Sequence, residues 1–141
     1  MYFDTAYIVK CYLNEPESPA VRALVRSAPA AYSSSWALAE VYCVFHRHVR
    51  EGATTSGEAQ ELARLFLEHV NDGLWSLIPA GEPFLKRVGT LVISAPPNLF
   101  LRTVDAVHLA TAKELGEGEI WTNDRHMLAA APHFGLIGRT V

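Results

Sequence analysis

The opening stretch of the chain, Met1–Leu13 (MYFDTAYIVKCYL), joins a short apolar and aromatic run to a helical pattern, with the acid Asp4 between them. Residues 1–4 predict a short buried strand. Apolar residues then recur at helical spacing, which predicts a helix from Thr5 to Leu13. A strand that leads directly into a helix is the building unit of a parallel α/β sheet, so this stretch indicates the fold class.

The rest of the chain repeats this alternation. Its boundaries are marked by a helix start at Ser18-Pro19, a capping box from Thr55 to Glu58, and glycines where helices end. Besides the helix that starts at Ser18, we predict helices over residues 35–51, 55–73, 82–94, 103–115 and 125–131, and strands over residues 30–33, 74–78, 119–122 and 136–137. No turn signal joins two strands into a hairpin. We therefore predict a parallel sheet covered by helices, an α/β sandwich in a single domain of residues 1–141.

The composition is typical of one packed domain. Of the 141 residues, 50% are hydrophobic and 19% are charged, which is enough apolar material for a core and too much for a disordered tail. The longest run without an ionisable residue, Val88–Leu101, is broken by Pro96-Pro97, and Asp4 stands where a secretory signal carries basic residues. We therefore expect a soluble, cytoplasmic protein without a membrane partner.

The net charge and the cysteines narrow the classes of function. A net charge of −3 argues against a broad basic face that coats nucleic acid. Subtracting the four acids described below leaves +1, which allows a local basic rim. Cys11 and Cys43 form neither a disulfide framework nor a metal-ligand spacing, and their apolar helical surroundings predict two buried free thiols.

Two acids stand in helices that are otherwise apolar. Glu40 is the only charged residue of residues 36–45, and a helix that is apolar nearly all round is usually buried. Such a carboxylate reaches solvent through a narrow gap, pairs with a structural arginine, or lines a polar cleft. Asp105 is the only fully charged residue of residues 103–112. Its alternative role is to stabilise the first turn of its helix through the helix dipole.

Two further acids follow predicted strands. Asp4 ends the first strand and Asp124 follows the strand at residues 119–122, and each can alternatively cap the next helix. In open parallel sheets, ligands bind at the carboxyl ends of the strands. Carboxylates that converge there repel each other unless divalent cations neutralise them, and oxygen-only ligands suit Mg²⁺ or Mn²⁺. We therefore predict a metal site that supports phosphoryl displacement. No nucleophile elbow, P-loop or dinucleotide fingerprint competes with this interpretation.

Four segments around these acids resemble the motifs of PIN-domain ribonucleases, most closely those of the VapC toxins of bacterial and archaeal type II toxin–antitoxin systems. The segments occur in the order and at the spacing of the family, and they are Tyr2–Ala6, Ala37–Val41, Leu101–Ala110 and Trp121–Arg125. The likeness runs from Asp4 to the C-terminus. It implies a PIN domain, which is a three-layer sandwich with a Rossmann-like central parallel β-sheet and helices on both faces.

The resemblance also implies the chemistry of the site. It implies a Mg²⁺- or Mn²⁺-dependent endoribonuclease whose catalytic, metal-binding acids are Asp4, Glu40, Asp105 and Asp124. Under this hypothesis the first three acids anchor one ion, and Asp124 orients that ion's water or holds a second ion. Hydrolysis then leaves a 5′-phosphate and a 3′-hydroxyl. Supporting positions of the family fall on Thr5, Thr122 and Asn123.

Partners are implied in the same way. The family implies an RNA substrate, a homodimer, and a VapB-type antitoxin that binds a groove on the early helices and neutralises the toxin. Three basic residues lie close in sequence to the site acids and are candidate RNA contacts, namely Lys10, Arg102 and Arg125.

We assign structural roles to the histidines and arginines outside the four motif acids and the candidate RNA contacts. His108 lies one turn after Asp105, and we expect it to be packed or hydrogen-bonded, since the acids already supply ligands for a hard metal. A basic helix end at His46, Arg47, His48 and Arg50 is typical of a solvated last turn, which favours cations, and less typical of an RNA contact.

Three other functions share part of this pattern. A housekeeping PIN-domain nuclease of RNA processing has the same motifs but no antitoxin, and a neighbouring antitoxin gene distinguishes the two. A catalytically silent PIN-fold binding module is disfavoured by the complete set of acids. A phosphoacceptor signalling domain is excluded, because Asp4 has no acidic neighbour and the only lysines are Lys10, Lys86 and Lys113.

Overall fold

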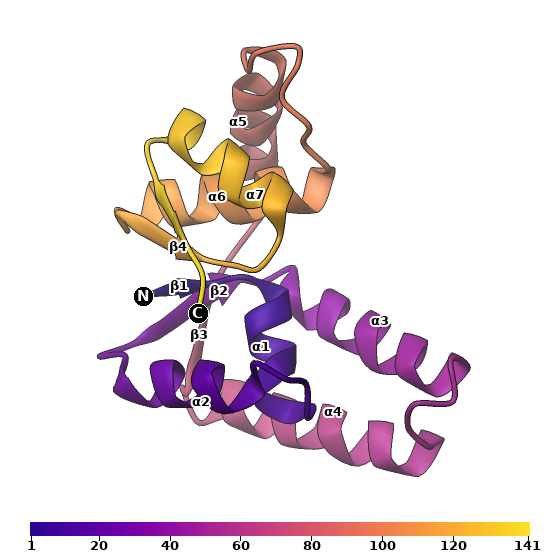
Figure 1. The fold of residues 1–141 in the computed structure, drawn as a ribbon. Coiled ribbons are helices and arrows are strands. Elements are labelled where there is room, and N and C mark those ends of the chain that lie inside the picture. Colours follow the sequence, from indigo (N-terminus) through magenta and orange to yellow (C-terminus); the bar gives the residue numbers. More distant parts are fainter.

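The computed structural model describes residues 1–141 and is built around a five-stranded sheet in which all neighbouring strands run parallel (Figure 1). The strands lie in the order β3-β2-β1-β4-β5. Their bounds are Tyr2–Phe3 (β1), Ala31–Ser34 (β2), Trp75–Ile78 (β3), Glu119–Trp121 (β4) and Ile137–Arg139 (β5). The first strand of the chain is therefore the central strand of the sheet.

Helices cover both faces of this sheet, which confirms the predicted three-layer sandwich (Figure 1). One face carries α1 (Thr5–Tyr12), α2 (Ser18–Ser27), α3 (Ala37–Arg50) and α4 (Ser56–Asn71). The other face carries α5 (Glu82–Ile93), α6 (Thr103–Leu115), α7 (Arg125–Ala130) and a short 3-10 turn, Ala131–Phe134. We call these two groups the α1–α4 layer and the α5–α7 layer. Each predicted helix and strand is present, with ends that differ by no more than two residues.

The alternation of side chains along β1 assigns one residue to each layer. Tyr2 packs in the core beneath α5–α7 and Phe3 packs in the core beneath α1–α4. β1 pairs with β2 through Tyr32 and with β4 through Ile120, so its carboxyl end points to the same edge of the sheet as theirs. The residue that follows β1 is thus placed where a parallel sheet binds its ligands.

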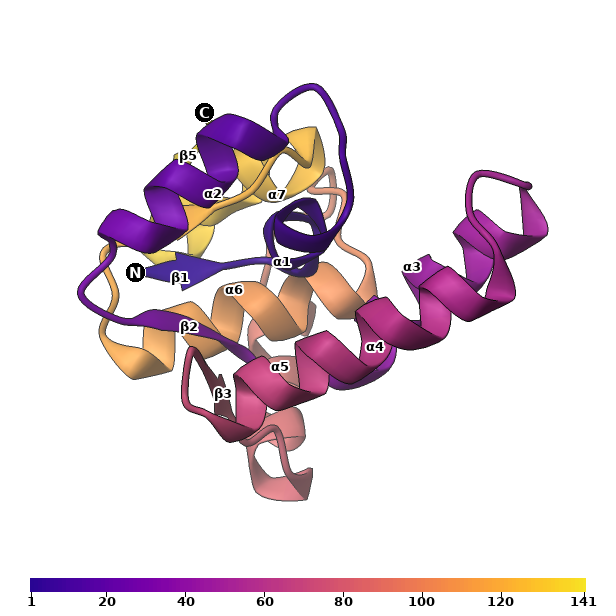
Figure 2. The same ribbon diagram turned by 90° about the horizontal axis from the view of Figure 1, so that it is seen from below.

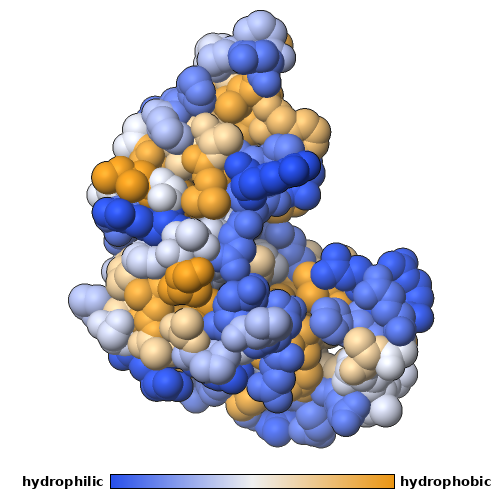
Figure 3. Space-filling model, viewed as in Figure 1, coloured by the Kyte–Doolittle hydropathy of each residue, from blue (hydrophilic) through white to orange (hydrophobic).

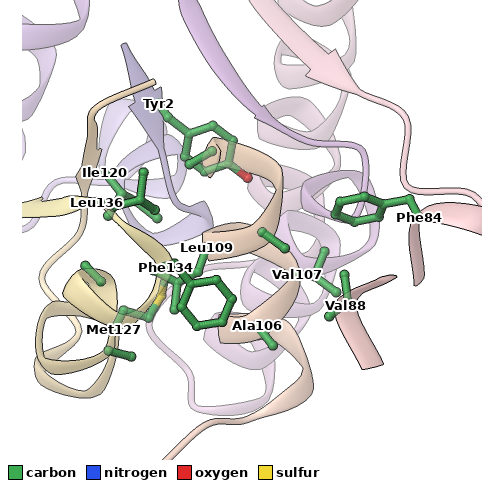
Figure 4. Close-up of a cluster of buried hydrophobic side chains, with 14 residues drawn as sticks. Tyr2, Phe84, Val88, Ala106, Val107, Leu109, Ile120, Met127, Phe134 and Leu136 are labelled. Carbon is green, nitrogen blue, oxygen red and sulfur yellow. The ribbon is translucent and has the colours of Figure 1, made fainter. Parts of the chain in front are cut away.

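The two cores are filled in different ways. The core of the α1–α4 layer is dominated by large rings, which are Phe3, Tyr7, Phe45, Phe66 and Trp75. The core of the α5–α7 layer surrounds α6, with Tyr2 entering from β1 (Figure 4), and contains five alanines: Ala106, Ala110, Ala112, Ala130 and Ala131. Small side chains let α6 lie close to the sheet, and its residues from Asp105 to Ala112 are all buried.

α3 and α4 lie side by side and extend away from the sheet as an arm (Figure 2). Only one face of α3 is buried, and Tyr42 is 40% exposed, so the expectation of a helix buried nearly all round is wrong. The reason is that α4 covers one side of α3 and no element covers the opposite side. Cys43 is exposed and Cys11 is only partly buried, so the predicted pair of buried thiols is also wrong. None of the helices combines the length and the apolar character that crossing a membrane requires.

Candidate active site

One cavity of about 650 Å³ lies at the carboxyl ends of β1 and β4. Side chains from α1, α3, α6 and the loop before α7 line it, and among them are all four predicted site acids: Asp4, Glu40, Asp105 and Asp124. Figure 3 shows the surface hollowed between the α3–α4 arm and the helices of the opposite layer. The fold therefore brings together four acids that are up to 120 residues apart in the chain.

Asp4 is the N-cap of α1, and it is also a buried carboxylate in the cavity wall. One carboxylate oxygen accepts a hydrogen bond from the backbone N–H of Tyr7 at 2.9 Å, and the other accepts one from the hydroxyl of Thr122. Asp4 is only 4% exposed and takes part in no ion pair. Burial raises the pKa of Asp4 above its usual value, although these hydrogen bonds favour the charged form. A buried carboxylate without a cation is costly, and it is the feature of the site that most needs explanation.

Asp124 is the N-cap of α7 and lies at the rim of the cavity. One carboxylate oxygen accepts hydrogen bonds from the backbone N–H groups of His126 and Met127 at 2.7 and 3.3 Å, and the other bonds to Arg102. Partial burial would raise the pKa of Asp124, but these bonds outweigh it and the pKa is lowered. Thr122 links the two capping acids, because its hydroxyl accepts from the Asp124 N–H at 3.0 Å and donates to Asp4.

Asp105 lies in the first turn of α6 and is paired with Arg102. Both carboxylate oxygens accept from the guanidinium at 2.9 Å, and one of them also accepts the backbone N–H of Arg102 at 3.0 Å. Asp105 is 1% exposed, whereas the side chain of Arg102 is 54% exposed. The same guanidinium reaches Asp124, so Arg102 bridges α6 and the start of α7 across the cavity.

Glu40 is held by His108, which connects the two layers of the molecule. The Nε2 atom of His108 lies 3.0 Å from a Glu40 carboxylate oxygen and 3.2 Å from the Thr5 hydroxyl, and its Nδ1 atom lies 2.8 Å from the Tyr2 hydroxyl. Because a carboxylate only accepts, Nε2 carries a proton toward Glu40, and in the neutral ring Nδ1 accepts from Tyr2. Burial raises the pKa of Tyr2, which keeps that hydroxyl protonated. His108 is 1% exposed, which agrees with the expected hydrogen-bonded histidine.

The other predicted residues lie in different settings. Lys10 lines the cavity, but its ammonium is paired with Glu17 at 2.6 Å and Glu15 at 3.2 Å. Arg125 is exposed and does not line the cavity. Asn123 does not line it either, because its side-chain oxygen accepts from the hydroxyls of Tyr7 and Thr140. Through these bonds Asn123 ties down the C-terminal segment, and its supporting role in the site stays a prediction.

Arg47 is a cavity residue that the sequence interpretation missed. It was expected to lie in a solvated last turn, yet it lines the cavity together with Glu40 and Val44. These three residues are spaced at i, i+4 and i+7 on α3, which is the signal that would have identified the shared face. Arg47 is exposed and takes part in no ion pair, so its charge is available at the cavity edge.

The donor chemistry of this cavity fits a hard divalent cation. Five carboxylates line it, because Glu15 joins the four site acids, and the most buried pair, Asp4 and Asp105, has one arginine for two negative charges. Carboxylate oxygens are the ligands that Mg²⁺ and Mn²⁺ take in proteins. In the present arrangement no three such side chains lie close enough together to hold an ion, and Arg102 and His108 contact the oxygens of Asp105, Asp124 and Glu40.

The sheet order and the acidic cavity at its carboxyl edge define the class of protein. Residues 1–132 match the PIN domain family, and this chain belongs to it. The structure also resembles the crystal structure of Mycobacterium tuberculosis VapC20, described as a Sarcin-Ricin loop cleaving toxin, with a TM-score of 0.72. That similarity covers 92% of this chain and 93% of the other at 15% sequence identity, and it supports the fold.

A closer relative identifies the branch of the family. The chain is 33% identical over 141 residues to Ribonuclease VapC46 of Mycobacterium tuberculosis (strain ATCC 25618 / H37Rv). This match covers 96% of the present chain and 93% of the relative. Within the PIN-domain family, the chain is therefore a VapC homologue.

Proposed function

We propose that this protein is a metal-dependent endoribonuclease of the VapC type, which acts on RNA in the cytoplasm and is neutralised by a cognate VapB-type antitoxin. The observation that carries the proposal is Asp4, a buried carboxylate in the wall of the cavity that has no ion-pair partner. The similarity to a protein named Ribonuclease VapC46 supports the reaction class, and the structural similarity to a toxin supports the biological role.

In this proposal Asp4, Glu40 and Asp105 hold a Mg²⁺ or Mn²⁺ ion, and Asp124 completes the site. A divalent cation bound there would act as a Lewis acid on the phosphodiester and lower the pKa of water. The chain itself supplies orientation: Thr122 and the N–H of Tyr7 fix the Asp4 carboxylate, and His108 fixes Glu40. These hydrogen bonds orient the carboxylates of Asp4 and Glu40 before RNA binds.

The test is cleavage of total cellular RNA by the purified protein in Mn²⁺ and in EDTA. We expect cleavage in Mn²⁺ only, and we expect Asp4→Asn and Glu40→Gln to lower its rate about a hundredfold or more, since a metal site contributes several kcal/mol to the barrier. Asp72→Asn is the matched control, because Asp72 is an exposed aspartate outside the cavity. Full activity of Asp4→Asn would contradict the assignment.

The toxin role needs a separate test, because a housekeeping nuclease would pass the first one. Expression of the wild-type chain alone should arrest growth, and co-expression of the short reading frame next to its gene should restore growth. Asp4→Asn should be harmless in the same cells. Size-exclusion chromatography of the chain with that partner would establish the complex, and the same experiment on the chain alone would test the proposed homodimer.

A further inference from the structure

Arg102 is the one arginine whose guanidinium lies among the site acids. It forms a two-pronged pair with Asp105, with both contacts at 2.9 Å, and its outer nitrogen also bonds to Asp124. Three of the four oxygens of these two carboxylates are therefore occupied by one cation. A divalent ion held by Asp105 and Asp124 would need the same oxygens, so the arginine and the ion compete for them.

The comparison with Arg87 separates this role from that of an ordinary ion pair. Arg87 contacts Glu114 with the same two-pronged geometry, at 2.6 and 2.7 Å, but both side chains are on the surface and away from the cavity. Asp105 is 1% exposed, so its charge requires a partner in every state of the protein. Arg102 meets that requirement when no metal is bound, and its side chain is 54% exposed and free to leave toward solvent.

The surroundings of Arg102 indicate where its guanidinium goes after it leaves the acids. The cavity that it lines is also lined by Arg47, which takes part in no ion pair, and by Lys10, which is already neutralised by two glutamates. A planar guanidinium matches two oxygens of a phosphate as well as it matches a carboxylate. A released Arg102 would therefore join Arg47 as a second free cation at the cavity edge.

We propose that Arg102 is a displaceable counter-ion. It neutralises Asp105 and Asp124 in the metal-free protein, and when a divalent cation takes their oxygens, its guanidinium turns to the RNA phosphate. This inference rests on the proposed metal-dependent nuclease function. It assigns opposite effects to one side chain, because Arg102 opposes metal binding and favours RNA binding.

The first measurement is Mn²⁺ binding by isothermal titration calorimetry, with no RNA present. Arg102→Gln should lower the dissociation constant for Mn²⁺ about three- to tenfold, as expected for loss of a charged, half-exposed competitor. Arg102→Lys, which keeps the charge but not the two-pronged contact, should fall between Arg102→Gln and the wild type. Arg87→Gln should bind Mn²⁺ like the wild type. Circular dichroism checks that each variant is folded, and Arg102→Lys serves if Arg102→Gln is not.

The second measurement is binding of a fluorescein-labelled phosphorothioate RNA oligonucleotide, which resists hydrolysis, by fluorescence anisotropy in EDTA and in Mn²⁺. Arg102→Gln should weaken RNA binding about three- to tenfold in Mn²⁺ and leave it unchanged in EDTA, where the wild-type guanidinium is held by the acids. If Arg102→Gln weakened RNA binding equally in EDTA and in Mn²⁺, Arg102 would contact RNA without leaving Asp105. That result would overturn the proposed movement of Arg102 from the acids to the RNA.

The outcomes separate the inference from the proposed function. If the wild type binds Mn²⁺ and folded Arg102→Gln and Arg102→Lys bind it no more tightly, the counter-ion role is wrong and the nuclease proposal stands. If the wild type binds no Mn²⁺, the metal site itself is wrong and the inference falls with it.

Discussion

The two helical layers carry two site acids each, but they are built differently. The α1–α4 layer supplies Asp4 and Glu40 and packs around large aromatic rings, whereas the α5–α7 layer supplies Asp105 and Asp124 and packs around alanines. In the α1–α4 layer, α3 is buried on one face only and projects from the sheet with α4. Small side chains let α6 sit close to the sheet with eight consecutive buried residues. Glu40 is thus on a projecting arm, whereas Asp105 is on a closely packed helix.

A smaller side chain should destabilise the α1–α4 layer, and a larger side chain should destabilise the α5–α7 layer. Phe66→Ala leaves a cavity among the rings and should lower the free energy of unfolding by about 3–5 kcal/mol. Ala110→Val overfills the packing around α6 and should lower it by about 1–3 kcal/mol. Urea denaturation measures both. The controls are Leu67→Ala, at the exposed position next to Phe66, and Ala129→Val, at an exposed position of α7, and they should change stability by less than the buried changes.

The link between the layers should be sensitive to loss of His108. His108→Ala leaves the buried Tyr2 hydroxyl without its acceptor and Glu40 without its donor, so we expect a loss of about 2–3 kcal/mol. His46→Ala, at an exposed position on the same arm as Glu40, should change stability by less than about 0.5 kcal/mol. Thermal unfolding followed by circular dichroism compares them. Equal effects of the two substitutions would show that the layers do not depend on this contact.

The buried charge of Asp4 should lower the free energy of unfolding of the metal-free protein at neutral pH, compared with a protein that has a neutral side chain at this position. Its folded-state pKa is raised by burial, so above that pKa the folded protein holds a charge that the unfolded chain holds at lower cost. Asp4→Asn should therefore raise the free energy of unfolding in EDTA at pH 7. As pH falls through the raised pKa, Asp4 takes up a proton and the difference between the two proteins should shrink. A constant difference from pH 7 to pH 4 would contradict this.

Much of the fold could be predicted because its signals are local. Helix boundaries followed from apolar spacing, from the capping box of Thr55 and Glu58, and from glycines with positive φ such as Gly116. The acids at strand ends were recognisable because Asp4 and Asp124 follow directly on strands, and both turned out to cap a helix and to line the cavity. Capping and a place in the site were treated as alternatives, but capping engages one oxygen of each carboxylate and leaves the other for Thr122 or Arg102.

The remaining details depend on contacts that spacing does not encode. Glu40 was expected in the cleft because α3 looked buried, yet α3 is half exposed and Glu40 reaches the cavity on its open side. The pairing of Lys10 with Glu15 and Glu17, and the contact of Asn123 with Tyr7, depend on how loops fold back against α1. The sequence around a residue predicted where that residue lies, but not which side chain forms its ion pair or hydrogen bond.

The central position of β1 has a consequence for synthesis of the protein. β1 is the first strand to leave the ribosome, but its neighbour β4 is at residues 119–121 of a 141-residue chain. Until then a nascent chain has an open edge at β1, and it still lacks Asp124, the last of the four site acids. Domains fold as units once their long-range partners are available. The ribosome must therefore have synthesised the chain through Asp124 before the four acids can meet in one cavity.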